Sequence, residues 1–179
     1  MLRVMLLLGC LMPGGLLAQT VPEPEGYRAA PYAAPVPEGL SGATTVNVEE
    51  ARRLWEEGEV AFIDVLPREP KPADLPEGTI WRERPHDSIP GATWLPNVGY
   101  EELSPEEQAY LDGGRRALTE GDPTRPVLFF CKTDCWMSWN AAKRALGMGY
   151  GNVTWFPGGA DGWAGAGFEI EPTEPMALP

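Results

Sequence analysis

The chain has 179 residues, of which 26 are Asp or Glu and 14 are Lys or Arg, so its formal net charge is −12. This balance argues against a duplex-binding protein, which needs clustered Lys and Arg, and against adhesion to anionic membranes. The length predicts one domain with a hydrophobic core, and 20 Pro with 21 Gly predict much irregular backbone.

Residues 1–18 have the pattern of a secretory signal peptide. Arg3 supplies the positive charge, a short apolar run follows, and the small residue Ala18 precedes the predicted cleavage site. An alternative is a lipobox-like site with Cys10 acylated. The apolar run is too short to cross a bilayer as a helix, so beyond the signal we expect no membrane segment. We expect export to the bacterial periplasm, an oxidising compartment.

The mature chain is expected to have three parts. Residues 19–43 are a Pro-rich extended arm in which Tyr27 and Tyr32 are the large anchors. Residues 44–168 form the domain, and residues 169–179 are a frayed tail without periodicity.

Helices and buried strands alternate along the domain. Sequence patterns typical of capping boxes, at Asn47 and Ser104, begin two of the helices. The expected elements are a helix from Asn47 to Gly58, a strand over 60–65, a long Pro-rich loop over 67–85, a helix from Ser104 to Gly113 and Gly114, a strand over 127–130, a helix over 136–146 and a strand over 153–156. The pattern predicts an α/β fold with a mainly parallel central sheet, whose carboxyl-terminal strand ends carry the chemistry.

Two cysteines remain after removal of the signal, Cys131 at the end of an expected strand and Cys135 at the start of an expected helix. Amides and the helix dipole at this place predict a lowered pKa for Cys131. A disulfide between the two would close a short loop, which contributes only about 2 kcal/mol in the chain-entropy model. We therefore favour a chemically active pair over a purely structural disulfide.

An ordered set of motifs resembles the rhodanese-like domains. The set is Ile63-Asp64-Val65, then residues 88–92, then Phe129-Phe130-Cys131, and then residues 153–159 with Trp163. The resemblance implies a three-layer α/β domain and sulfurtransferase chemistry on Cys131. Residues 131–144 further resemble the exported Cys-Trp (CXXCW) motif family, which is associated with catabolism dependent on pyrroloquinoline quinone (PQQ). That resemblance implies a periplasmic accessory protein of alcohol oxidation.

The chain departs from the pattern of active rhodaneses. Trp136 stands where an anion-binding Arg commonly ends the loop, and Ser88 replaces the His before Ile-Pro-Gly-Ala. Thiosulfate is therefore a weakened candidate, and persulfide transfer or dithiol exchange fits better, with Cys131 attacking and Cys135 resolving. The expected site comprises Cys131 and Cys135, the loop residues Lys132, Thr133, Asp134 and Trp136, and the supporting residues Asp64, His86 and Trp139; no cofactor is expected.

Two other functions stay open. One is a non-catalytic module with its cysteines in a disulfide, which uses its Trp residues to bind a quinoprotein dehydrogenase, its cytochrome or a quinone. The other is a copper chaperone with Cys131, Cys135, His86 and Met137 as ligands. The expected partner is accordingly a small thiol or sulfur-containing substrate, or a periplasmic quinoprotein dehydrogenase or cytochrome.

Overall fold

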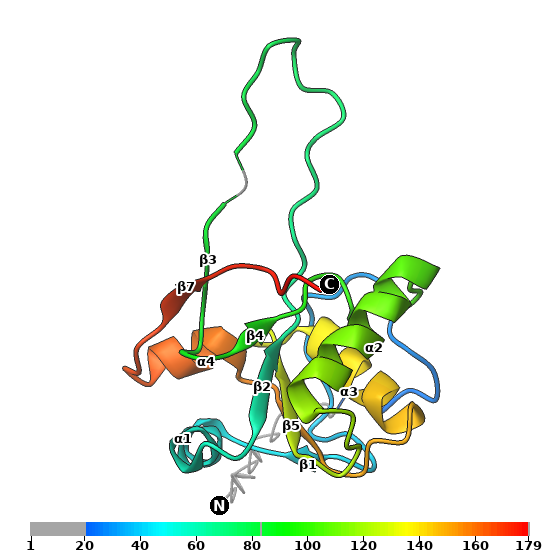
Figure 1. Cartoon of the computed structure of the whole chain (residues 1–179), viewed down its shortest axis with the longest axis vertical. Coiled ribbons are helices and arrows are strands. Elements are labelled where there is room, and N and C mark those ends of the chain that lie inside the picture. The colour runs from blue at the N-terminus through cyan, green and yellow to red at the C-terminus, as the bar shows by residue number, and fades with distance from the viewer. Residues whose placement is uncertain (1–20, 83, 179) are drawn as a thin grey trace, which may run out of the picture.

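Five short parallel strands form the central sheet of the computed structural model, which describes residues 21–82 and 84–178 (Figure 1). The strand order is β1-β6-β5-β2-β4, and β2 and β5 are in register from Ala61 beside Val127 to Asp64 beside Phe130. All residues of β5 and β6 are buried, which explains their continuous apolar sequence. The strands are β1 (Thr44–Thr45), β2 (Ala61–Asp64), β4 (Thr93–Trp94), β5 (Val127–Phe130) and β6 (Val153–Phe156).

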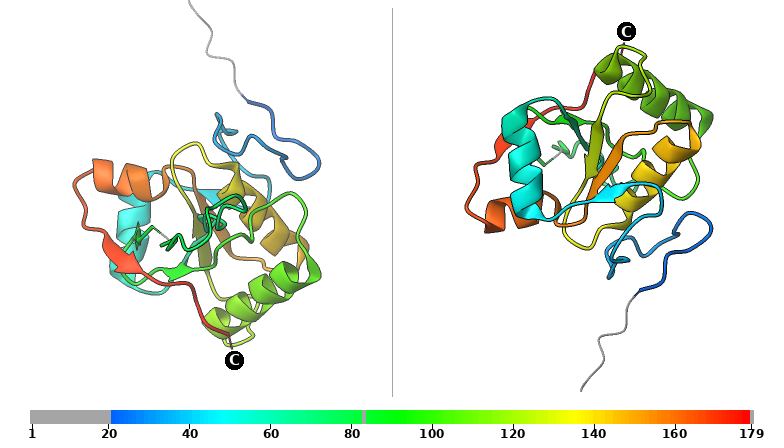
Figure 2. Two further views of the ribbon diagram at one scale, coloured as in Figure 1. Left: turned by 90° about the horizontal axis from the view of Figure 1, so that it is seen from above. Right: turned by 90° about the horizontal axis from the view of Figure 1, so that it is seen from below.

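Helices cover both faces of this sheet (Figure 2). One core contains side chains of α2 and α3, and a second core contains side chains of α1 and α4. The helices are α1 (Val48–Glu57), α2 (Pro105–Thr119), α3 (Trp136–Gly147) and α4 (Gly159–Gly165). The expected α/β class with a mainly parallel sheet is therefore confirmed.

The second expected helix is longer than its glycines suggested. It begins at the expected capping box of Ser104 and Glu107 but runs through Gly113 and Gly114 as far as Thr119. A Cβ at Gly114 would stand 2.7 Å from the side chain of Leu95, so the glycine serves close packing here and does not end the helix.

The expectation of a frayed tail is wrong. Residues Glu171–Thr173 form β7, which pairs in antiparallel fashion with β3 (His86–Ser88). Beyond it, the amide of Met176 donates to the carbonyl of Trp94 at 2.9 Å. The tail thus borders the sheet edge that carries β4.

The long loop after β2 projects away from the body (Figure 1). Its described residues include Ile80, whose side chain is 81% exposed. The expected signal peptide and its cleavage site near Ala18 lie outside the described residues. Among the residues that are described, no helix is long and apolar enough to cross a membrane.

Candidate functional site

Cys131 lies directly after β5, at the carboxyl-terminal edge of the sheet where chemistry was expected, and it is 1% exposed. Its carbonyl accepts the amide of Ala160 at 2.8 Å, which joins the loop to α4. Gly159 makes this approach possible: its φ is +56°, and a Cβ there would stand 2.5 Å from the Cys131 carbonyl oxygen. A second tie runs from Thr133 Oγ1 to the carbonyl of Gly158 at 2.8 Å.

Cys135 is the N-cap residue of α3 and is only partly buried. Its thiol forms a hydrogen bond with the thiol of Cys131, and this contact is the largest cause that lowers the Cys135 pKa, to about 7. The amides of Met137 and Ser138 also lower the Cys135 pKa, although the thiol makes no capping hydrogen bond to the helix. Burial acts in the opposite direction and raises this pKa. Cys135 is therefore substantially ionised at neutral pH.

The expectation of a lowered pKa for Cys131 is wrong. Burial is the main cause that raises its pKa well above the usual value, and the hydrogen bond and charge of Cys135 and the charge of Asp64 add to it. The amide of Lys132 opposes these effects without cancelling them. The reason lies in the fold: the strand ends inside the protein, and the amino terminus of α3 faces the other cysteine.

Asp64 ends β2 and is completely buried. One carboxylate oxygen accepts the amide of Leu66 at 2.9 Å, as expected for a strand-end Asp that fixes a loop. The other oxygen accepts Ser88 Oγ at 2.6 Å and pairs with His86 Nε2 at 2.7 Å. His86 is thus held by Asp64, and this contact brings together two of the expected supporting residues.

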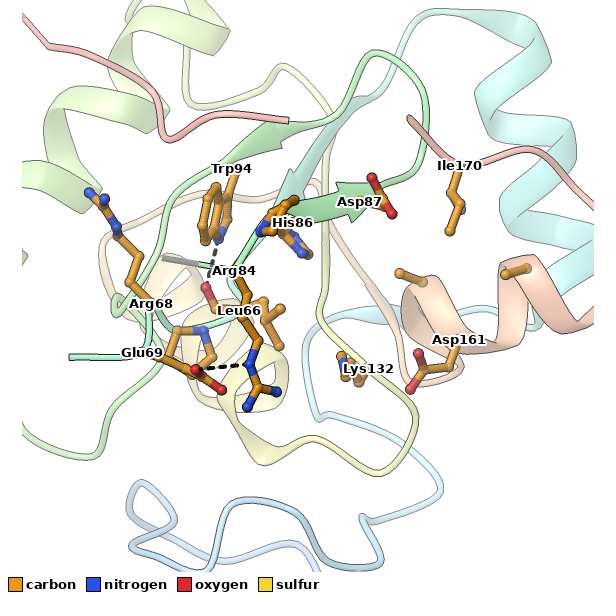
Figure 3. A pocket seen from close by; sticks show the side chains of 14 residues that line it. Leu66, Arg68, Glu69, Arg84, His86, Asp87, Trp94, Lys132, Asp161 and Ile170 are labelled. Carbon is orange, nitrogen blue, oxygen red and sulfur yellow. Dashed lines mark hydrogen bonds and ion pairs between the residues drawn. The ribbon is translucent and has the colours of Figure 1, made fainter. Parts of the chain in front are cut away.

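A cleft of about 490 Å³ opens beside these groups (Figure 3). Its ionisable lining residues come from the base of the projecting loop, from β3, from the cysteine loop and from α4: Arg68, Glu69, Arg84, His86, Asp87, Lys132 and Asp161. Lys132 is the cysteine-loop residue among those that line it. The cleft therefore adjoins the loop, while the thiols lie deeper.

The Pro-rich arm reaches the same loop from another direction. Ala34 donates its amide to the carbonyl of Asp134 at 3.0 Å, and Trp136 donates its amide to the carbonyl of Tyr32 at 2.9 Å. Ala33 lies opposite Cys135 in an antiparallel bridge between these two bonds. The arm thus pairs with the backbone on both sides of the partly buried Cys135.

The tryptophans near the loop are buried, which agrees with a packing role. Trp136 is 3% exposed and Trp139 is fully buried, with their rings 5.4 Å apart in an edge-to-face arrangement. Both indoles also bind the arm, because their Nε1 atoms donate to the carbonyls of Pro35 and Gly39.

Sequence reasoning missed Asn140, which is fully buried on α3. Its side-chain oxygen accepts the amide of Arg28 at 2.9 Å, and its nitrogen donates to the Arg28 and Gly99 carbonyls at 2.9 Å each. The usable signal was a polar side chain within an otherwise apolar stretch of helix, which needs partners when it is buried. Those partners come from distant segments, so the sequence does not name them.

The copper ligand set is not brought together. Within residues 21–82 and 84–178, no three His, Cys, Asp or Glu side chains are grouped so that they could hold a metal ion. His86 is engaged with Asp64, and Met137 packs in the core that contains α2 and α3.

Comparisons with known proteins agree with this architecture. The family model of the rhodanese-like domain matches residues 47–166. Among solved structures, a thiosulfate sulfurtransferase from Pseudomonas aeruginosa matches with a TM-score of 0.50 at 19% identity, over 76% of this chain and 22% of its own. An EanB variant in complex with hercynine matches with the same TM-score and identity, over 73% of this chain and 32% of its own. The chain therefore spans less than a third of either protein, and the likeness shows the fold. No curated protein sequence matches.

Proposed function

We propose, from the premise that the chain belongs to the rhodanese-like domain family, that it carries sulfur or electrons on Cys131 and Cys135. The observation that supports this is the hydrogen bond between the two thiols at the carboxyl-terminal edge of the sheet, with the pKa of Cys135 lowered to about 7. A thiolate is the reactive form in both sulfur transfer and disulfide exchange.

The greater exposure of Cys135, its place at the amino terminus of α3 and its lowered pKa support roles for the two cysteines that reverse those expected from the sequence. The Cys135 thiolate attacks the sulfane sulfur of a persulfide or polysulfide donor; a new S–S bond forms on Cys135, and the donor leaves as a thiolate. An acceptor thiol then takes the outer sulfur and restores Cys135. If the attacked molecule is a disulfide, the Cys135 thiolate forms a mixed disulfide with one of its sulfurs and releases the other as a thiolate. Cys131 then loses its proton and attacks the Cys135 sulfur, which releases the second thiolate and leaves a disulfide between the two cysteines.

Intact mass spectrometry tests this proposal. Protein incubated with polysulfide, and separately with an oxidised dithiol, is weighed before and after a reductant is added. Sulfur transfer predicts one added sulfur atom that is retained in Cys131→Ser and lost in Cys135→Ser. Dithiol exchange predicts a loss of two hydrogens that requires both cysteines. A mass that neither reagent changes contradicts the proposal.

We further propose that the protein is exported to the periplasm and is an accessory protein of PQQ-dependent alcohol oxidation. This part is supported by the signal-like residues 1–18 and by the motif of residues 131–144. Cell fractionation during growth on an alcohol tests it, followed by purification of the tagged chain. Recovery of a quinoprotein dehydrogenase or its cytochrome with the periplasmic protein is expected, and a cytoplasmic protein contradicts it.

A second candidate function is a non-catalytic binding module. The observation that favours it is the 1% exposure of Cys131 together with the arm paired across Cys135. In this case the cysteines of the native protein form a disulfide that resists mild reductants, and partner binding survives replacement of both by Ser.

A further inference from the structure

The arm is held almost entirely by groups of the body. Between residues 24 and 39 the arm forms one β-bridge, at Ala33. Most of its backbone hydrogen bonds are made with α3 and the cysteine loop. Residues 29–31, 33 and 35 are exposed, whereas Pro37 and Leu40 are buried. The arm is therefore buried most deeply at its carboxyl-terminal end, and before Pro37 exposed residues alternate with half-buried Tyr32, Ala34 and Val36, which pack against the core.

Side chains on one face of α3 bind the arm. Trp136, Trp139, Asn140 and Lys143 follow the i, i+3, i+4, i+7 spacing of a single helix face. All four donate side-chain hydrogen bonds to arm carbonyls: those of Pro35 at 3.1 Å, Gly39 at 3.3 Å, Arg28 at 2.9 Å and Pro24 at 2.8 Å. These bonds give a structural role to the side-chain nitrogen atoms of residues 136–143, which have no role in the proposed sulfur chemistry.

A cation–π contact also holds the arm near its amino-terminal end. The guanidinium of Arg144 lies 4.1 Å from the ring centroid of Tyr27 and donates to carbonyls on the body, including that of Val98 at 3.1 Å. Tyr27 is 37% exposed, so this contact is at the surface.

We propose that residues 24–36 form a releasable cover over Cys135, so that reagents and partners reach this thiol through the minority of molecules in which the cover has lifted. Two observations carry the proposal: the backbone bonds on both sides of Cys135, and the helix face that holds the arm by hydrogen bonds to its carbonyls. Segments held by a few surface hydrogen bonds open locally at a far lower free energy than the whole fold. Lifting the cover breaks the two backbone bonds beside Cys135 and the side-chain bonds from α3 to residues 24–35, and it leaves the central sheet intact.

Two neighbouring alanines offer a matched pair of variants. Ala34→Pro removes the amide that binds the Asp134 carbonyl, and Ala33→Pro introduces the same ring where the amide makes no hydrogen bond within the described part of the chain. Both positions lie in a Pro-rich segment and neither has a positive φ, as a proline requires; Ala33 is exposed and Ala34 is half-buried. We expect native-state alkylation of Cys135 by iodoacetamide to rise about 5-fold in Ala34→Pro, the effect of one lost hydrogen bond, and to stay at the wild-type rate in Ala33→Pro.

Trypsin reports the position of the arm independently. Arg28 is the only Lys or Arg between residues 21 and 51, so cleavage after it reports release of the arm. We expect this cleavage to rise in the same proportion as the alkylation. Tyr27→Ala, which removes the Arg144 contact and leaves the cysteine loop unchanged, provides a second route to the same two increases.

The dependence of the alkylation rate on low urea concentrations separates local lifting from unfolding, because lifting exposes little surface and its rate hardly varies with urea. Equal alkylation rates in Ala34→Pro and Ala33→Pro overturn the proposal. Faster cleavage at Arg28 without faster alkylation overturns it as well, since the arm then moves without covering the thiol. Alkylation needs no sulfur donor, so these results stand whether or not the cysteine pair carries sulfur.

Discussion

Replacement of Cys131 by Ala is expected to make Cys135 much less acidic. The hydrogen bond from the Cys131 thiol is the largest cause of the lowered Cys135 pKa, and the substitution removes that donor. Since the amides of Met137 and Ser138 remain, the pKa should rise from about 7 toward, but not fully to, its ordinary value of 9.0.

The magnitude follows from the fraction of thiolate. At pH 7 a pKa of about 7 leaves half of the Cys135 thiols ionised, whereas a pKa of 9.0 leaves about one in a hundred. Alkylation of Cys135 at pH 7 should therefore slow by between about 5- and 50-fold, and the rates of variant and wild type should converge above pH 9.

The assay is the pH profile of iodoacetamide modification at Cys135, read by mass spectrometry. Cys131→Ser is the matched control, because its hydroxyl keeps a donor in place and should retain part of the shift. The reasoning is refuted if the Cys131→Ala variant titrates at the same pH as the wild type. A uniform rate change at every pH would indicate altered access and would refute it equally.

Three further predictions concern stability. The pKa of Cys135 is lower in the folded than in the unfolded state, so its ionisation contributes on the order of 2–3 kcal/mol to the free energy of unfolding. This contribution should be present above pH 9 and disappear as the pH falls through 7. The free energies of urea unfolding of the wild type and of Cys135→Ser should therefore diverge between these pH values. Asp64→Ala leaves buried Ser88 and the His86 ring without their acceptor and should cost about 2–4 kcal/mol in urea unfolding, whereas a loss below about 1 kcal/mol would contradict the network. Gly159→Ala places a Cβ against the Cys131 carbonyl at positive φ and should destabilise the fold by about 1–3 kcal/mol, against no change for Ala at exposed Gly165 in the same helix.

Local patterns predicted much of the framework because they act over a few residues. The Asn47 and Ser104 capping boxes form as expected, and the apolar runs of β5 and β6 are buried on both faces. The glycines at 113 and 114 misled the prediction, since their reason is a packing partner far away in the sequence.

Sequence patterns alone predicted three strands of the central sheet, β2, β5 and β6, the position of Cys131 at the carboxyl-terminal end of β5, and a second cysteine at the start of the next helix. They did not predict β1 and β4, which are two residues each. The difference in acidity between the thiols depends on the tertiary structure, because burial is the main cause that raises the pKa of Cys131, whereas the hydrogen bond from Cys131 and nearby amides outweigh burial and lower the pKa of Cys135. The tertiary structure also decided that Asn140 binds the backbone of Arg28, 112 residues away. Periodicity and caps are properties of neighbouring residues, whereas desolvation and long-range hydrogen bonds exist only after the chain has folded.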